Sequence, residues 1–171
     1  MSDLREIATS LGLADVATYV NSGNVVFTCS ETDLPTVATA LEQRIAEHSD
    51  VQTEVIALSR DELARVVADN PYPDETDPKC LHVVFHRSDV GPDAAATLAA
   101  AERRARTKGS QDQGTVVGLN VYLHTPNGLG RSELAVQLNR SRSATGAGSA
   151  PAVSTMRNWA TVTRLVALLN G

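Results

Sequence analysis

Hydrophobic positions along the chain recur with two periods, and each period predicts a different kind of element. Spacings of three and four residues predict helices, whereas alternation or a short apolar run predicts strands. The helical pattern covers residues 4–11, 34–45, 59–69, 93–104, 131–140 and 159–169. The strand pattern covers residues 16–20, 25–28, 51–58, 81–86, 115–117 and 120–125. The predicted order is αββαβ, followed by αβαββαα.

Cap and turn residues divide this pattern into two halves. Ser59 and Glu62 have the spacing of a capping box, which predicts the start of a helix. Three prolines between residues 70 and 79 rule out a helix or a central strand there, so an extended connector is expected. The predicted division is an N-terminal half (1–69), a connector (70–80) and a C-terminal half (81–171). Residues 141–152, composed mainly of Ser, Ala and Gly, favour a mobile segment.

The predicted fold class is α+β, with two ferredoxin-like halves of which the first lacks its first strand. In a ferredoxin-like βαββαβ unit that strand is central and lies between the third and the fourth. Here the third would be residues 24–28 and the fourth residues 51–58, which leaves two facing rows of unpaired backbone groups. Direct pairing of the flanking strands or a strand from a partner chain would relieve this. We expect a third solution, a translation start upstream of Met1, because Met1 leads almost directly into a helix.

Composition narrows the classes of function. Hydrophobic residues make up 42% of the 171 residues, which is enough for a packed core. The net charge of −5 argues against nonspecific binding of nucleic acid, so nucleic acid is not expected as a partner. No apolar run approaches the ~20 residues of a membrane span, and no apolar signal segment opens the chain. We expect no membrane association and a cytoplasmic location, and a homo-oligomer is compatible with the sequence.

The first candidate for chemistry is the stretch that contains Gly128, Gly130, Arg131 and Ser132. Glycines let the backbone approach a ligand, and the helix that follows offers unpaired N–H groups and a positive dipole end. Arg131 adds a fixed charge and Ser132 a hydroxyl group. This combination suits a phosphate or a carboxylate. The alternative is a flexible turn in which Ser132 only caps the helix.

The second candidate comprises Arg157, Asn158 and Trp159. Asn158 or Thr155 is placed to cap the closing helix, which would bring Arg157 close to another helix N-terminus. Trp159 would then offer a flat surface to a planar ligand. The alternative is that Trp159 fills the core and Arg157 pairs with an acidic residue.

Weaker candidates are a turn, the histidines and the cysteines. Asn21 and Ser22 lie in a turn that would present its amides to a ligand, with an ordinary hairpin turn as the alternative. The histidines of the strands lack the close spacing and supporting carboxylates of a metal site, so neither a metal nor a cofactor is expected. Cys29 and Cys80 lack metal-type spacing. No spacing nominates a nucleophile, so the sequence leaves open whether the protein is an enzyme.

Several short phrases, taken in order, resemble a known family. They are the turn at residues 21–24, Asn70-Pro71, Val121-Tyr122-Leu123-His124, residues 128–132, and Arg157-Asn158-Trp159. Over nearly its whole length the chain resembles the bacterial family called domain of unknown function 1697, which implies a fold and no established activity. Relatives begin with a strand that ends in Arg-Gly-Ile-Asn, which this chain lacks. They often carry Lys where this chain has Glu133, and Asn or Arg where it has Ala160.

Two functions follow from these patterns. The first is binding of a small anionic ligand through Arg131, Ser132 and Arg157. The alternative is a protein-interaction module that uses a sheet edge or a groove and performs no catalysis. Nucleotides, phosphosugars or sulfate should raise the thermal stability of an anion binder and leave that of an interaction module unchanged.

Overall fold

The structure is a computed structural model that describes residues 2–19, 23–31, 33–49, 51–88, 90, 93–144 and 153–171. It is an α+β protein with two sheets. The chain divides into two compact units: unit 1 comprises residues 1–64 and 164–171, and unit 2 comprises residues 65–163. None of the helices in the described part of the chain is long and apolar enough to cross a bilayer.

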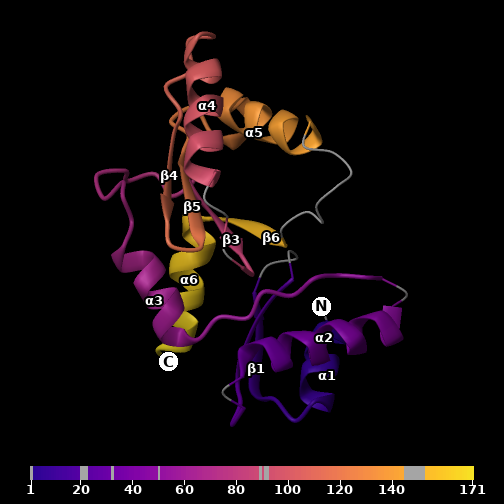
Figure 1. The fold of residues 1–171 in the computed structure, drawn as a ribbon. Coiled ribbons are helices and arrows are strands. Elements are labelled where there is room, and N and C mark those ends of the chain that lie inside the picture. The colour runs from indigo at the N-terminus through magenta and orange to yellow at the C-terminus, as the bar shows by residue number, and fades with distance from the viewer. Residues whose placement is uncertain are drawn as a thin grey trace. The chain divides into compact units, whose positions relative to one another are not determined.

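Unit 1 combines a β-hairpin with two helices (Figure 1). α1 (Ser2–Ser10) leads into β1 (Ala14–Tyr19), and β2 (Asn24–Thr28) returns antiparallel to β1. Gly12, between α1 and β1, has a φ of 78°, a conformation that favours glycine. α2 (Leu34–Ser49) follows the hairpin. The buried core of this unit consists of Ile7, Ala8, Leu13, Val37 and Leu41.

Residues 51–59 contain no strand, so the strand predicted at residues 51–58 is wrong. A strand needs a neighbour that completes its ladder of backbone hydrogen bonds. Within the described part of unit 1, β1 and β2 pair only with each other. The backbone N–H of Val55 donates instead to the carboxylate of Glu42 on α2, at 2.7 Å.

α3 (Arg60–Ala68) begins at the predicted capping box. The hydroxyl oxygen of Ser59 accepts the backbone N–H of Glu62 at 3.2 Å, and the Glu62 carboxylate accepts the Ser59 N–H at 2.7 Å. The connector, residues 70–80, contains neither helix nor strand, as predicted.

Unit 2 contains a four-stranded antiparallel sheet with the order β4-β5-β3-β6. Its strands are β3 (Leu81–His86), β4 (Gln113–Val117), β5 (Asn120–His124) and β6 (Ser154–Asn158). β3 is therefore central and pairs with both β5 and β6, whereas β6 pairs with β3 alone among the described strands. The hydrophobic pattern did not predict β6, because this strand is largely polar and depends on its pairing with β3.

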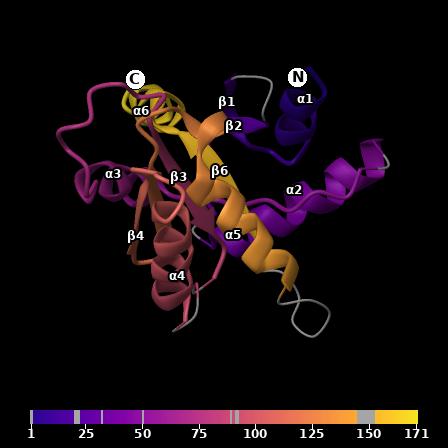
Figure 2. The ribbon, with the colours of Figure 1, turned by 90° about the horizontal axis from the view of Figure 1, so that it is seen from above.

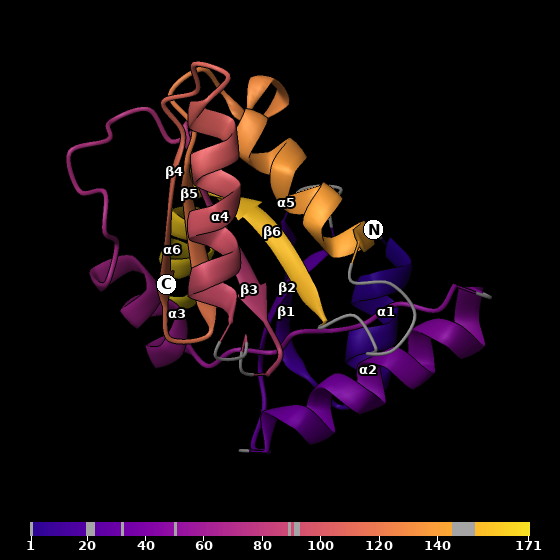
Figure 3. The ribbon, with the colours of Figure 1, turned by 45° about the horizontal axis from the view of Figure 1, so that its top comes forward.

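Two helices, α4 (Ala94–Arg106) and α5 (Glu133–Ala144), cover one face of this sheet (Figures 2 and 3). Their shared core comprises Leu98, Ala101, Ala105, Leu123 and Leu134. α5 reaches beyond residue 140, where the sequence pattern had placed its end.

The opposite face of the unit 2 sheet carries Tyr122, since neighbouring strand residues point to alternate faces and Leu123 faces the two helices. The Tyr122 hydroxyl donates to the carbonyl oxygen of Val66 in α3 at 2.7 Å. Burial raises the pKa of Tyr122 to about 12, so the hydroxyl remains a donor. α6 (Trp159–Leu169) begins directly after β6.

Candidate functional site

The predicted glycine turn forms a short 3-10 helix, Leu129–Arg131, that leads into α5. Gly128 has a φ of 80°, which side chains with a Cβ atom rarely adopt. The hydroxyl oxygen of Ser132 accepts the backbone N–H of Ala135 at 3.0 Å, so Ser132 caps α5. The side chain of Arg131 is exposed to solvent.

A buried carboxylate, that of Asp112, lies at the start of α5. One of its oxygens accepts the Ser132 hydroxyl proton at 2.9 Å and the Leu134 backbone N–H at 3.2 Å. Asp112 is only 6% exposed. The negative group that a helix N-terminus favours is thus supplied by the protein itself. Sequence analysis missed Asp112, because it lies in a polar loop with no periodicity.

The second motif spans the junction of β6 and α6. The side-chain oxygen of Asn158 accepts the backbone N–H of Thr161 at 2.9 Å, so Asn158 caps α6. The guanidinium of Arg157 donates to the carbonyl oxygen of Met156 at 2.8 Å. Burial lowers the pKa of Arg157, although a guanidinium remains protonated. Trp159 is half-buried.

Strand register brings the two motifs to the same end of the unit 2 sheet. Leu81 lies opposite His124, and His82 lies opposite Asn158, so β3 begins where β5 and β6 end. Asp112 directly precedes β4 at this end and holds the first turn of α5 there. The helices α5 and α6 therefore both start at this end.

The hairpin turn of unit 1 is described only in part. Asn21 and Ser22, the candidate ligand residues of this turn, lie outside the described residues. Asn24 opens β2 and is buried, and its side-chain amide donates to the carbonyl oxygen of Tyr19 at 3.1 Å. This contact closes the hairpin.

The histidines of the sheet have separate environments. His82 is buried, its Nδ1 has no hydrogen-bond partner in the described structure, and burial lowers its pKa. His124 points to the other face, with Nε2 2.7 Å from the Glu75 carboxylate. Nδ1 of His86 lies 3.1 Å from the carbonyl oxygen of Leu119. Among the described residues, no group of three or more His, Cys, Asp or Glu is arranged to hold a metal ion.

The connector is fastened to β4 and β5 by side chains that sequence analysis did not single out. The ring of Tyr72 stacks on His124 with centroids 5.2 Å apart, and its hydroxyl lies 2.9 Å from that of Thr115. Glu75 adds its contact with His124; the backbone N–H of Asp77 and then His124 lower the pKa of Glu75. Proline and acidic residues predicted an extended connector, but no sequence pattern indicated these attachments.

Unit 1 exposes apolar side chains where the predicted strand failed to form. Val51 is 55% exposed and Leu58 38% exposed. Between them, Val55 packs against the core of α1 and α2. Val55 therefore holds the segment to the unit, whereas the side chains of Val51 and Leu58 are exposed.

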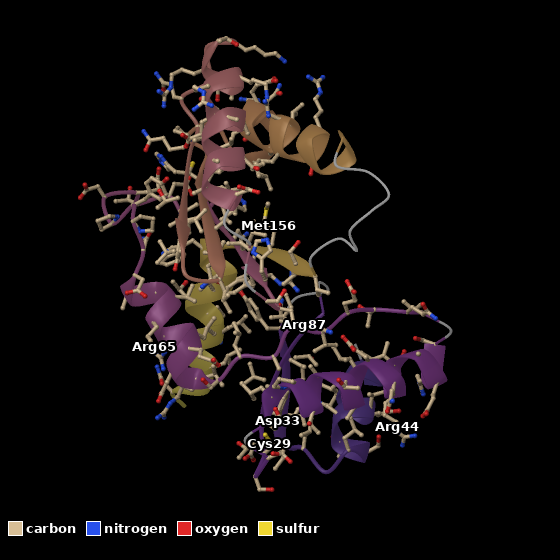
Figure 4. All side chains as sticks on the ribbon, in the orientation of Figure 1. Cys29, Asp33, Arg44, Arg65, Arg87 and Met156 are labelled. Atoms are coloured by element: carbon tan, nitrogen blue, oxygen red, sulfur yellow. The ribbon has the colours of Figure 1, made fainter. Side chains whose placement is uncertain are left out.

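A shallow cavity of about 290 Å³ lies between α1 and α2. Arg44, labelled in Figure 4, lines it, and its guanidinium reaches Glu47 at 3.1 Å and the Ser10 hydroxyl at 3.3 Å. The remaining lining residues are Glu6, Ile7 and His48. Arg44 is thus already paired within the protein.

Together, these features define a two-sheet α+β protein with polar helix caps at one sheet end of unit 2 and a segment of unit 1, residues 51–58, that forms no strand. A family model described as protein of unknown function (DUF1697) matches residues 1–122. The chain belongs to this family, as its short motifs indicated.

A solved structure described as the conserved bacterial protein SP0830 from Streptococcus pneumoniae has a similar fold. The TM-score is 0.70 at 20% sequence identity, and the match covers all of this chain and 89% of that chain. At this level of identity the likeness concerns the fold alone. No curated protein matches the chain significantly.

Proposed function

We propose that the protein is an interaction module in which the sheet of unit 1 accepts an extended strand from a partner polypeptide. One observation carries the proposal: residues 51–58 follow a hairpin and a helix, as β6 does, yet they form no strand and join neither sheet in the part of the chain that the structure describes. In unit 2 the equivalent position beside β6 is held by β3. The accepted strand would lie between β2 and residues 51–58.

The topology of unit 2 supports this placement. Its elements follow the order βαββαβ with the first strand in the centre, which is the arrangement of a ferredoxin-like unit. Unit 1 has the same order from α1 to α2, and residues 51–58 follow α2 without forming the last strand. Ferredoxin-like halves are therefore part of the proposal, as is the division into residues 1–69 and 81–171.

The energetics of unit 1 favour an added strand. An isolated two-stranded hairpin is marginally stable, and a third strand adds both hydrogen bonds and buried apolar area. A partner strand would satisfy backbone groups along β2 and cover Val51 and Leu58, which are now exposed. The contact between Val55 and Glu42 shows how one backbone donor of the segment is satisfied without a strand.

Hydrogen exchange with a strand-forming probe tests the proposal. The probe is an eight-residue peptide of alternating Val and Thr, and its binding should slow amide exchange in residues 24–28 and 51–58. Consecutive amides of a strand point to opposite sides. One of the variants Ile56→Pro and Ala57→Pro should therefore abolish the protection, and the other should retain most of it.

Two results would count against the proposal, and a third would identify the partner. Slow exchange of residues 51–58 in the free monomer, equal to that of β3, would show that the segment is already paired. Failure of the peptide to slow amide exchange in either segment would show that unit 1 does not accept a strand. Protection that appears only in a dimer, seen by light scattering, would assign the strand to a second copy of the chain.

The anionic-ligand hypothesis stays a prediction centred on Arg131 and Arg157. It is weaker than the acceptor proposal, because Ser132 and the first turn of α5 are already occupied by Asp112. A rise in melting temperature with sulfate or nucleotides that is lost in Arg131→Ala would revive it. A cytoplasmic location and a homo-oligomeric state are likewise predictions.

A further inference from the structure

The sign of the charge changes along the chain. Residues 1–93 contain seventeen acidic and six basic residues, whereas residues 94–171, which begin with α4, contain three acidic and nine basic residues. The net charge of −5 for the whole chain conceals this difference. Charge asymmetry between two parts of a chain indicates nucleic acid or a membrane surface as a partner of the basic part. The argument from net charge against nucleic acid therefore does not hold for residues 94–171.

Exposed basic side chains gather where the end of α4 meets the start of α5. The ion pair between Lys108, just after α4, and Glu133, in the first turn of α5, joins the two helix ends. Hydrogen bonds from Lys108 and Gln137, and then the charges of Lys108 and Arg140, lower the pKa of Glu133, which places Arg140 near the same carboxylate. The exposed basic residues of this surface are Arg103, Arg104, Arg106, Lys108, Arg131 and Arg140.

The carboxylates of this region are too few to neutralise its cations. Residues 94–140 contain three acidic and six basic residues. Glu102 accepts the backbone N–H of Gly114 at 2.5 Å. Asp112 is buried and bonded to the start of α5, and Glu133 is paired with Lys108. The surface formed by the end of α4 and the start of α5 therefore carries an excess of positive charge.

Stabilisation of the helices explains only part of this charge. Cations in the last turn of α4 complement the negative end of its dipole. Arg131 has the opposite position, because it ends the 3-10 helix that leads into the N-terminus of α5, where a dipole disfavours a cation. Arg131 is exposed to solvent. The positive charge at the start of α5 thus needs a reason other than the helix dipole.

The chemistry of the surface favours the phosphates of a nucleic-acid duplex. Five of the six cations are Arg, whose planar guanidinium group matches the geometry of a phosphate. Binding of a helix to a membrane surface needs an open apolar face, but α4 and α5 use theirs in their shared core. Single strands are held by aromatic stacking. Tyr122, the only Phe, Trp or Tyr among residues 94–140, is buried on the other face of the sheet.

We infer that the surface formed by the end of α4 and the start of α5 binds the phosphate backbone of a nucleic-acid duplex independently of sequence. The guanidinium groups of Arg103, Arg106 and Arg131 contact the phosphates. The Leu134 backbone N–H at the start of α5 does not, because Asp112 already accepts it. This inference does not depend on the strand acceptor proposed for unit 1.

Fluorescence anisotropy of labelled duplexes tests the inference on the full chain. The probes are DNA and RNA duplexes of about 20 base pairs. A duplex should bind at about 20 mM NaCl, and the affinity should fall at least ~10-fold at about 200 mM, because phosphate contacts release counterions. Two duplexes of unrelated sequence should bind equally. A single strand of the same length should bind more weakly than the duplex, and tighter binding of the single strand would overturn the duplex as the partner.

Matched variants locate the contact. Arg103→Gln, Arg106→Gln and Arg131→Gln should each weaken binding several-fold and reduce the salt dependence, whereas Arg131→Lys keeps the charge and should retain most of the affinity. Arg65→Gln is the control, since it removes the same group from an exposed residue of α3, labelled in Figure 4. An equal loss in Arg65→Gln would assign binding to overall charge and overturn the proposed surface.

The remaining outcomes concern the class of partner. Absence of binding to both duplexes at about 20 mM NaCl would overturn the inference. Binding to vesicles of phosphatidylcholine and phosphatidylserine, without binding to a duplex, would assign the surface to a membrane instead. Competition by poly-glutamate as effective as that by unlabelled duplex, at equal concentration of charge, would indicate an acidic protein as the partner and would overturn the nucleic acid.

Discussion

Two segments that each follow a hairpin and a helix in the chain, β6 in unit 2 and residues 51–58 in unit 1, differ in structure. β6 has the sequence Ser-Thr-Met-Arg-Asn and is a strand; the unit 1 segment is richer in Val, Ile and Leu and is not. The difference lies in the neighbour, because β3 pairs with β6 along its whole length. Strand formation here depends on a ladder partner more than on composition.

The two units also differ in how polar groups are satisfied. In unit 2, Asp112, Ser132 and Asn158 complete the starts of two helices at one sheet end. In unit 1, the Val55 amide has the Glu42 carboxylate in place of a strand. Unit 2 thus satisfies these polar groups where its sheet and helices meet, whereas unit 1 satisfies the Val55 amide with a side chain of α2. Four measurements test this difference between the units.

The largest effect is expected in the core of unit 2. Leu134 is fully buried, so Leu134→Ala should lower the free energy of unfolding by about 3 kcal/mol. Urea unfolding followed by fluorescence of Trp159, the only tryptophan, reports this loss. Leu41→Ala, the matched change in unit 1, should leave the Trp159 midpoint in place. Equal shifts in both variants would show that the units unfold together.

A smaller loss is expected at the start of α5. Asp112→Ala leaves the Ser132 hydroxyl and the Leu134 amide without their acceptor, which should cost about 2 kcal/mol. Asp112→Asn keeps an acceptor oxygen and should cost less. The same urea assay measures both, and an unchanged midpoint in Asp112→Ala would contradict the capping role.

Acid should destabilise unit 2 through His82. Burial lowers its pKa in the folded protein below the ordinary 6.5, so the unfolded chain takes up the proton first as pH falls. Stability should therefore decline below about pH 6.5 and stop declining through this group once the pH is below its folded-state pKa. His82→Leu should flatten that part of the profile, measured by urea midpoints between pH 5 and 8. A profile as steep as in the unchanged protein would exclude His82 as the cause, and His86→Gln is the control.

The smallest effect is expected at the connector. Tyr72→Phe removes the hydroxyl contact with Thr115 and keeps the ring on His124, so the loss should be about 1 kcal/mol. Hydrogen exchange of residues 70–80 should become faster while that of β3 stays constant. Uniform acceleration across unit 2 would mean that the contact supports the whole sheet.

Local patterns predicted the elements whose stability is local. The capping box at Ser59 and Glu62 formed where expected. It depends on two side chains that are three residues apart in the sequence. Pattern offered Ser132 as a helix cap in place of an anion site, and Asn158 or Thr155 as the cap of the closing helix. In the structure Ser132 and Asn158 are the caps.

Contacts between residues that lie far apart in the chain could not be predicted from the sequence pattern. Ser132 and Asp112 are separated by twenty residues, and His124 and Glu75 by forty-nine, and no periodicity links either pair. β6 and residues 51–58 were misjudged for the same reason. Whether each became a strand depended on a neighbour that its own residues do not reveal.

Asp112 has a consequence for ligand screening. Because it is covalently part of the chain, its carboxylate is present at the start of α5 at an effective concentration that does not fall on dilution and that dissolved phosphate at millimolar levels does not match. Anions added to the unchanged protein should therefore give no response at this helix. Asp112→Gly would free the same two donors, so that binding of an added anion at the start of α5 could then be detected.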